Sequence, residues 1–430
     1  MKKVLLIFLA LNSSALADDG FKYANPNSLD YIFILLCCAL VFIMQLGFMC
    51  LESGFCHRKN SINVAVKNLT DFMVSVLFFW LIGFGIMFGN TISSVIGCSE
   101  FASDFPTTEM AIFFLFQAMF CGAASTINSG AISGRAKFST YIIMSVAISG
   151  FIYPVFGHWA WGGLWDISNS GWLQKMGFKD FAGSTVVHST GAWVALAAII
   201  IIGPRKNKFD EQGNPKSVPP SSHLLAYIGI FLLTFGWFGF NAGSNLKADA
   251  GIVKIAINTV LAAVSGGLTA MFYNWWVDSS KTPEPATIGN GLLGGLVAIT
   301  ASCAWVTPAS SVLIGSIAGI IMIVSSNFIE KKLKLDDVVN AISVHGSCGI
   351  WGTLALAFFM KEEFLTTSRA SLLGVQALGV VTCFAWSFGS SFLVFKFLHD
   401  SYSLRVSKKA EEIGLNASEH NIPNEGRDLI

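Results

Sequence analysis

Two histidines occur inside long apolar stretches of the sequence, where ionisable side chains are rare. His188 ends the stretch Asp180-Phe-Ala-Gly-Ser-Thr-Val-Val-His, and His345 ends Asp337-Val-Val-Asn-Ala-Ile-Ser-Val-His. Ionisable groups at such depth usually mark a pathway. A neutral imidazole offers one hydrogen-bond donor and one acceptor. Two of them could guide a small neutral polar molecule, or pass a proton, through an apolar channel. The alternative is that each histidine packs between helices and bonds a neighbouring backbone group.

A second set of residues carries aromatic rings that could bind a cation. Phe116 and Phe120 are four residues apart and share one face of a helix. Phe240 lies in Gly236-Trp-Phe-Gly-Phe-Asn-Ala-Gly-Ser, and Trp161 closes an apolar run. Rings that converge on one vestibule can hold a cation by their π-faces. Each such cation–π contact is worth up to about 2 kcal/mol when it is desolvated. The alternative is that these rings are core or interface residues.

Asp180 precedes the His188 stretch and could cap a helix, organise a cation site, or do both. The nine cysteines show neither CxxC nor Cys/His metal spacing, and neither histidine has a carboxylate or Cys at ligand spacing. Phosphate-loop and G-x-S-x-G motifs are also absent from the sequence. We therefore expect no metal site, no cofactor and no catalytic residues.

These residues must be positioned by elements that cross a membrane. The chain has 430 residues, of which 53% are hydrophobic and 12% charged, whereas soluble domains carry about 25% charged residues. The net charge of +1 indicates no nucleic-acid partner. A run of about 20 apolar residues spans a lipid bilayer. Eleven such runs are predicted, at 29–51, 70–90, 110–131, 138–160, 182–203, 222–243, 252–277, 286–303, 309–329, 342–361 and 370–398.

The N-terminus and the loop charges predict how the chain is oriented. Lys2 and Lys3 precede a short apolar run that ends in Ala15-Leu-Ala17, which is typical of a signal peptide over residues 1–17. The alternative is an uncleaved anchor. Loops rich in Lys and Arg alternate with poorer loops, and the tail of residues 401–430 belongs to the rich set. Cytoplasmic loops are the rich ones, so the tail is predicted to be cytoplasmic and the mature N-terminus periplasmic.

The chain also shows signs of an internal repeat. In both histidine segments an Asp lies eight residues before the His, and a Val immediately before it. The two segments are separated by five spans, so they should run in opposite directions. This is the pattern of an inverted repeat, which tends to place a shared site near the middle of the membrane.

Several long motifs together resemble the ammonium transporter (Amt/Mep/Rh) family, in particular its bacterial Amt type. They lie in the family's order between about residues 28 and 415, and they include the Asp180–His188 segment with Gly203-Pro-Arg, Gly47-Phe-Met-Cys-Leu-Glu-Ser-Gly, the Gly236–Ser244 segment, Val306-Thr-Pro-Ala and Val344-His-Gly-Ser-Cys-Gly-Ile. The resemblance implies an all-α polytopic domain over residues 28–400 with eleven transmembrane helices, an inverted five-helix repeat and one pore per subunit. It further implies a homotrimer in the inner membrane.

The resemblance also implies roles for single residues. By position in the motifs, the family's outer ammonium site corresponds to Phe116, Phe120, Trp161 and Ser244, and its structural acidic residue below that site corresponds to Asp180. The family's stacked phenylalanine gate corresponds to Phe120 and Phe240, and its two pore histidines correspond to His188 and His345. The sequence departs from the family at Gly134, where Glu is usual, at Asn340, where Asp is common, and in the segment 414–421 of the tail. These departures concern subunit communication and regulation by the tail.

The expected mechanism follows from the cost of burying charge. Moving a bare ion into an apolar medium costs of order 20 kcal/mol, which cation–π contacts of about 2 kcal/mol each do not offset. Ammonium should therefore bind outside, lose its proton beyond the gate and pass the histidines as ammonia. Potassium, which has no proton to lose, should be excluded.

Two other functions are alternatives to ammonium transport, and the family resemblance implies one regulatory partner. A passive gas channel of the Rh type fits the aromatic cation set less well. A sensor with little transport would need a partner that docks near Arg405, Lys408 and Lys409, because only about thirty residues follow the last predicted span. The resemblance also implies a trimeric PII-type protein as a partner at the cytoplasmic mouth. The alternative is a merely solvated tail.

Overall fold

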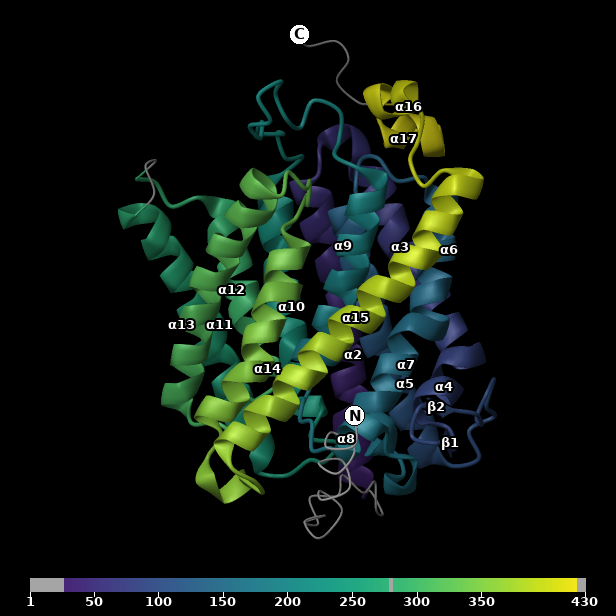
Figure 1. Ribbon diagram of the computed structural model, residues 1–430, viewed down its shortest axis with the longest axis vertical. Coiled ribbons are helices and arrows are strands. Elements are labelled where there is room, and N and C mark those ends of the chain that lie inside the picture. Colours follow the sequence, from purple (N-terminus) through teal and green to yellow (C-terminus); the bar gives the residue numbers. More distant parts are fainter. Residues whose placement is uncertain (1–26, 278–280, 424–430) are drawn as a thin grey trace, which may run out of the picture.

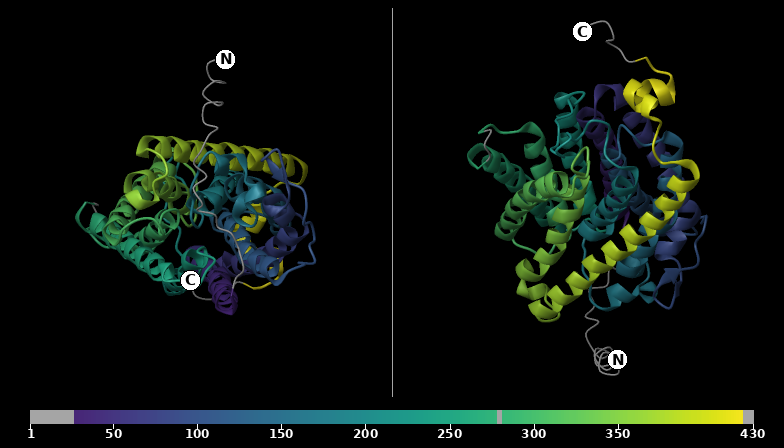
Figure 2. Two further views of the ribbon diagram at one scale, coloured as in Figure 1. Left: turned by 90° about the horizontal axis from the view of Figure 1, so that it is seen from below. Right: turned by 45° about the horizontal axis from the view of Figure 1, so that its top comes forward.

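A computed structural model describes residues 27–277 and 281–423, which form a bundle of long helices running along a common direction (Figures 1 and 2). In these residues, ten helical segments are long and apolar enough to cross a membrane, and the apolar helix α12 (Pro285–Thr300) adds a shorter one of 16 residues. All eleven coincide with predicted apolar runs. The all-α polytopic class is therefore confirmed. The predicted signal peptide lies outside the described residues.

The first half of the chain contributes five of these segments. They are α2 (Ser28–Phe55); α3 (Ser61–Phe78), continued by the π-helical η2 (Phe79–Gly83) and α4 (Phe84–Phe88); α5 (Thr108–Ala131); α6 (Phe138–Ala147), continued by the π-helical η3 (Ile148–Ile152) and α7 (Tyr153–Trp161); and the π-helical η6 (Ser184–Ser189), continued by α9 (Thr190–Ile202).

The second half contributes five more, and a last helix crosses the outside of the bundle. The five are α10 (His223–Gly243), α11 (Gly251–Trp276), α12, α13 (Pro308–Asn327) with the π-helical η7 (Phe328–Lys332), and the π-helical η8 (Ile342–Ser347) with α14 (Cys348–Phe359). The last helix is α15 (Arg369–Tyr402), which runs obliquely across both halves (Figure 1).

Short elements occupy the two ends of the bundle. They are the hairpin β1 (Thr91–Ile92) and β2 (Ile96–Gly97), the helix α8 (Trp172–Lys175), the 3-10 turns η1 (Arg58–Asn60), η4 (Gly162–Leu164), η5 (Ile167–Asn169) and η9 (Glu362–Phe364), and the helices α16 (Lys408–Ile413) and α17 (Leu415–His420). We call the end that carries α16 and α17 the tail end. The hairpin and α8 lie at the opposite end (Figure 1).

Polar caps define where many spanning helices begin. The side chain of Asn27 accepts hydrogen bonds from the backbone N–H groups of Leu29 and Asp30, and the carboxylate of Asp30 accepts one from the N–H of Asn27. Thr107 and Thr307 cap α5 and α13 by single side-chain bonds. These caps satisfy N–H groups that have no partner within the helix. Because an unpaired N–H is costly next to lipid, the caps position each helix along its axis.

One predicted boundary is wrong. The second span was expected at 70–90, but the helix begins at Ser61 and follows the turn η1 directly. The intervening residues include Lys67 and Asn68, whose polarity suggested a loop. Both are buried at 0–1% exposure, against α5 and α6. Hydropathy misses this part of the helix because the polar groups face protein rather than lipid.

The two histidine-bearing segments run in opposite directions, as the repeat predicted. α9 leads from His188 to Arg205 at the tail end, whereas η8 begins just after Asp336 at the same end. Arg205 donates hydrogen bonds to Asp336 from its backbone N–H and from its guanidinium, at 2.8 Å each. The end of one histidine helix is thereby joined to the start of the other.

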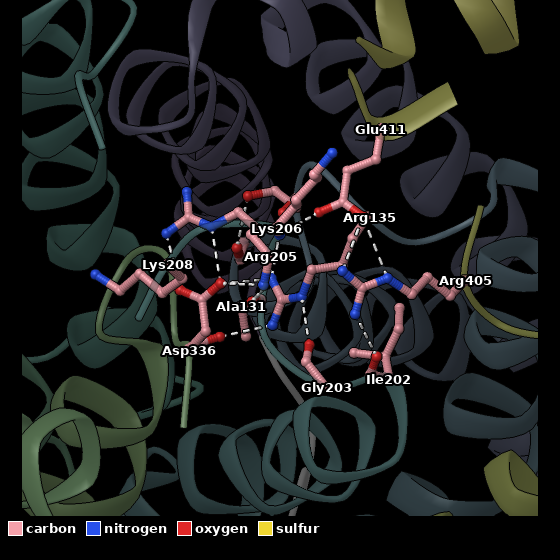
Figure 3. Close-up of polar contacts among 12 residues, drawn as sticks. Ala131, Arg135, Ile202, Gly203, Arg205, Lys206, Lys208, Asp336, Arg405 and Glu411 are labelled. Atoms are coloured by element: carbon pink, nitrogen blue, oxygen red, sulfur yellow. Dashed lines mark hydrogen bonds and ion pairs between the residues drawn. The ribbon is translucent and has the colours of Figure 1, made fainter. Parts of the chain in front are cut away.

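A buried arginine extends this junction to a third helix (Figure 3). Arg135 is fully buried, and its guanidinium donates to the carbonyls of Ala131, Gly203 and Asp336 at 2.6–2.9 Å. Ala131 is the last residue of α5 and Gly203 follows α9, so the cation caps two helix C-termini, where positive charge is favourable. We call Arg135, Arg205 and Asp336 the junction cluster. It fixes α5, α9 and η8 to one another.

The tail docks onto the tail end, which contradicts the alternative of a solvated tail. The side-chain oxygen of Asn416 accepts hydrogen bonds from the N–H groups of Ile62 and Asn63 at 3.0 Å and so caps the start of α3. The guanidinium of Arg405 donates to Glu411 and to the carbonyl of Ile202 (Figure 3). The tail therefore reaches both α3 and the end of α9.

Two departures from the family pattern occupy left-handed backbone conformations. Gly134 has φ +81° and Asn340 has φ +60°. Glycine adopts such angles without strain, and Asn tolerates them better than most residues. A Cβ at Gly134 would also lie 2.8 Å from the side chain of Asn60. Glu would be strained at position 134 in this structure.

Candidate functional site

The two histidines meet in the centre of the bundle. Their Nδ1 atoms are 3.2 Å apart and their ring centroids 5.2 Å apart, with an interplanar angle of 21°. His188 is completely buried and His345 is 6% exposed. One Nδ1–H can donate to the other ring, which leaves each Nε2 for a third molecule. Among the described residues, Nε2 of His188 has no hydrogen-bond partner.

The π-helical form of both segments is held by an aspartate before each. Asp180 accepts four hydrogen bonds, from the N–H groups of Gly183, Ser184, Thr185 and Val186 at 2.8–2.9 Å. Gly183, at φ +110°, makes the left-handed turn that allows this. π-helical turns are frequent at functional sites.

The second segment uses the same device with fewer bonds. Asp337 accepts one hydrogen bond, from the N–H of Ile342 at 2.8 Å. Each histidine thus lies in a widened turn that follows a capping carboxylate. This structural similarity is more detailed than the three matching positions in the sequence.

A stack of aromatic rings leads from His188 toward the end opposite the tail. Phe240 stacks on Phe120 at a centroid distance of 3.9 Å and an angle of 13°, and it lies 5.4 Å from the ring of His188. Phe116 lies 4.7 Å beyond Phe120, and Trp161 lies 6.3 Å from Phe120. The close parallel stack of Phe120 and Phe240 leaves no space between the rings for a hydrated ion.

Ser244 and Asp180 are connected to this aromatic group by hydrogen bonds. The hydroxyl of Ser244 donates to the carbonyl of Phe240 at 2.9 Å. Trp161 donates from its indole N–H to the carbonyl of Asp180 at 2.8 Å. The carboxylate of Asp180 is thus occupied by four backbone donors at the start of η6, and its backbone carbonyl positions Trp161.

Comparison with known proteins places this arrangement in a family. The model of the Ammonium Transporter Family matches residues 32–424. The chain belongs to the ammonium transporter family. It is 41% identical over 442 residues to the ammonium transporter Amt2 of Archaeoglobus fulgidus. This alignment covers 97% of this chain and 93% of that protein.

Solved structures support the same assignment. A protein named Sensor Amt Protein is 44% identical, with a TM-score of 0.89 over 91% of this chain and 98% of that one. Mep2 of Candida albicans is 24% identical, with a TM-score of 0.82 over 92% of this chain and 90% of that one, and shows likeness of fold. Members of the ammonium transporter family are multi-pass membrane proteins, in agreement with the spans found in this chain.

All eight residues singled out in the sequence thus lie in one continuous group. Phe116, Phe120, Trp161, Phe240 and Ser244 are connected through ring contacts or backbone bonds, and Phe240 contacts the histidine pair. Their roles in this ammonium transporter family member remain predictions.

The sequence reasoning did not single out Trp237. Its ring stacks on His188 at a centroid distance of 5.0 Å and an angle of 21°, and its indole N–H donates to Thr300 at 2.9 Å. The signal was available, because Trp237 is three residues before Phe240 and so shares its helix face. Trp237 therefore packs against the ring of His188 and is itself held by Thr300.

Replacing Asp180 by alanine is expected to destabilise the protein. Four N–H groups of η6 lose their acceptor in a buried site, and loss of a capping side chain costs about 1–2 kcal/mol. Thermal unfolding in detergent, followed by intrinsic fluorescence, measures the change. Asp180→Asn retains one acceptor oxygen and should unfold between the wild type and Asp180→Ala. Equal midpoints for all three proteins would contradict the capping role.

Proposed function

We propose that this protein transports ammonium across the inner membrane by binding NH4+ at the end opposite the tail and conducting NH3 past the two histidines. The observation that carries the proposal is the order of groups along one line: an aromatic cluster, a closed phenylalanine stack and a buried imidazole pair. Membership of the ammonium transporter family supports the substrate.

The outer group of residues suits a cation and the inner group does not. Phe116 and Trp161 present ring faces, which attract NH4+, and Ser244 adds a hydroxyl oxygen. Beyond Phe240, the histidines offer neutral imidazoles in a fully buried setting, where a bare ion would pay a large desolvation cost. Ammonium should release its proton at the gate and pass as ammonia.

Further parts of the proposal concern orientation and assembly. The tail end carries Arg58, Arg135, Arg205 and Arg405, so it should face the cytoplasm, as cytoplasmic loops are rich in Lys and Arg. We also propose a homotrimer with one pore per subunit, and a PII-type regulator at the tail end. Binding of a purified PII-type protein, with and without residues 406–430, tests the last point, and equal binding to both forms would contradict it.

A second candidate function is ammonium sensing with little transport. A specific observation favours it: the Sensor Amt Protein shares 44% identity with this chain. The docked tail could carry a signal, because it contacts both α3 and the end of α9.

Uptake into proteoliposomes separates the two functions. Labelled methylammonium should accumulate in vesicles that contain the wild-type protein, and an ammonium pulse should be transported while potassium is not. Binding of ammonium without uptake would favour the sensor. Potassium flux through the purified protein would contradict the proposed passage of neutral ammonia.

A further inference from the structure

A small cavity lies beside His345, on the side toward the tail end. Its volume is about 20 Å³, and its lining includes Phe48, Glu52, Asn290, Val339 and His345. A cavity of about 10–15 Å³ on this measure holds one water molecule, and ammonia and ammonium are of similar size. The ring of Phe48 lies 6.1 Å from that of His345, so the cavity adjoins the histidine pair.

Two of the lining side chains offer hydrogen-bond acceptors. One acceptor has no hydrogen-bond partner, and the other belongs to a carboxyl group without an ion pair, in the part of the chain that the structure describes. Asn290 is 1% exposed, and its Oδ1 has no hydrogen-bond partner in the part of the chain that the structure describes. Glu52 is also 1% exposed, and no ion pair to it is found within residues 27–277 and 281–423. Burying an unpaired acceptor or carboxylate is costly, which points to a ligand that donates hydrogen bonds.

Glu52 is held in a fixed position within the bundle. Asn68 of α3 donates to its Oε2 at 2.8 Å, and Asn68 itself accepts from Thr126 of α5 at 2.8 Å. Gly130 leaves room for the carboxylate, since a Cβ there would lie 3.1 Å from Cδ of Glu52 and 2.6 Å from Val339. The nearby Lys67 donates to the carbonyl of Ala136 instead of to Glu52.

We propose that this cavity is an inner ammonium site, in which Glu52 and Asn290 accept hydrogen bonds from NH4+ on the tail side of His345. The inference deepens the proposed function and depends on it. Ammonium carries four N–H donors and one positive charge, which match a carboxylate and an amide oxygen. The pore then has a cation site on each side of the histidines, built from ring faces at one end and from oxygen atoms at the other.

Sidedness of substrate binding tests the inference. Ammonium-evoked currents are recorded on proteoliposomes of known orientation, with ammonium added either at the tail side or at the opposite side. In Glu52→Gln, the half-saturating concentration at the tail side should rise about tenfold or more, because a hydrogen bond to a charged group is worth about 1.5–3 kcal/mol, while the opposite side shifts less than about twofold. In Asn290→Val, the half-saturating concentration at the tail side should also rise, by a smaller factor, and the opposite side should again change little.

Asp71→Asn is the matched control, because Asp71 is a buried carboxylate that bonds Ser125 and does not line the cavity. Equal shifts at both sides in Glu52→Gln, no shift at all, or the same tail-side shift in Asp71→Asn would overturn the inner site. If Glu52→Gln does not fold, Glu52→Asp and Asn290→Val carry the test. A wild-type protein without ammonium current would instead contradict the proposed function.

Discussion

Replacing His188 by alanine is expected to lower ammonium transport by about tenfold or more. The change removes an imidazole that can hydrogen-bond the passing molecule, which is worth about 1.5 kcal/mol, or about tenfold. It also leaves Nδ1 of His345 without its partner and opens a space beside Phe240 and Trp237. Water that enters this space should weaken the exclusion of potassium.

Uptake of labelled methylammonium and ammonium-evoked currents in proteoliposomes measure this effect. His345→Ala should change transport in the same direction. His223 is an exposed histidine at the start of α10, so His223→Ala should transport at the wild-type rate. Unchanged uptake and unchanged currents in both pore variants would remove the histidines from the mechanism.

Replacing Asp336 by alanine is expected to cost about 3–5 kcal/mol of stability, because it leaves buried arginine charge uncompensated. Asp336 is 2% exposed and bonds Arg205 at 2.8 Å, with Arg135 at 3.9 Å. The midpoint of thermal unfolding in detergent should fall markedly. Glu363→Gln, which breaks an exposed pair with Lys361, should change it little. A midpoint equal to that of the wild type in Asp336→Ala would contradict the role of the junction cluster.

The carboxylate of Asp336 also makes the stability of the protein depend on pH, in a direction that can be predicted. Burial alone would raise the pKa of Asp336, but the charges of Arg135 and Arg205 outweigh it and hold that pKa well below its usual value. The stabilisation is therefore complete above the unfolded value of about 3.9 and declines as the pH falls further. The difference in stability between wild type and Asp336→Ala should shrink in acid below that value.

The membrane class, the number of spans and most boundaries could be predicted from hydropathy, because lipid contact imposes a simple length and composition. The start of the second span could not. Lys67 and Asn68 look like loop residues in the sequence, yet they are buried between helices. Only knowledge of which helix faces contact one another separates a polar helix from a polar loop.

Some features of the candidate site could likewise be predicted from the sequence, and others could not. The eight predicted residues could be identified from spacing and family resemblance, and they meet in space. The stacking of Trp237 on His188 and the cavity at Glu52 depend on contacts between segments far apart in the chain. The π-helical turns around His188 and His345 also have no simple sequence period. In both turns an aspartate, Asp180 or Asp337, accepts hydrogen bonds from N–H groups at the start of the turn.

The stack of Phe120 on Phe240 has a consequence for the energetics of a cell that makes this protein in quantity. With ring centroids 3.9 Å apart, no continuous file of water connects the two faces of the membrane through that point. Many copies could then be inserted without opening a water-filled leak for ions through the membrane at that point.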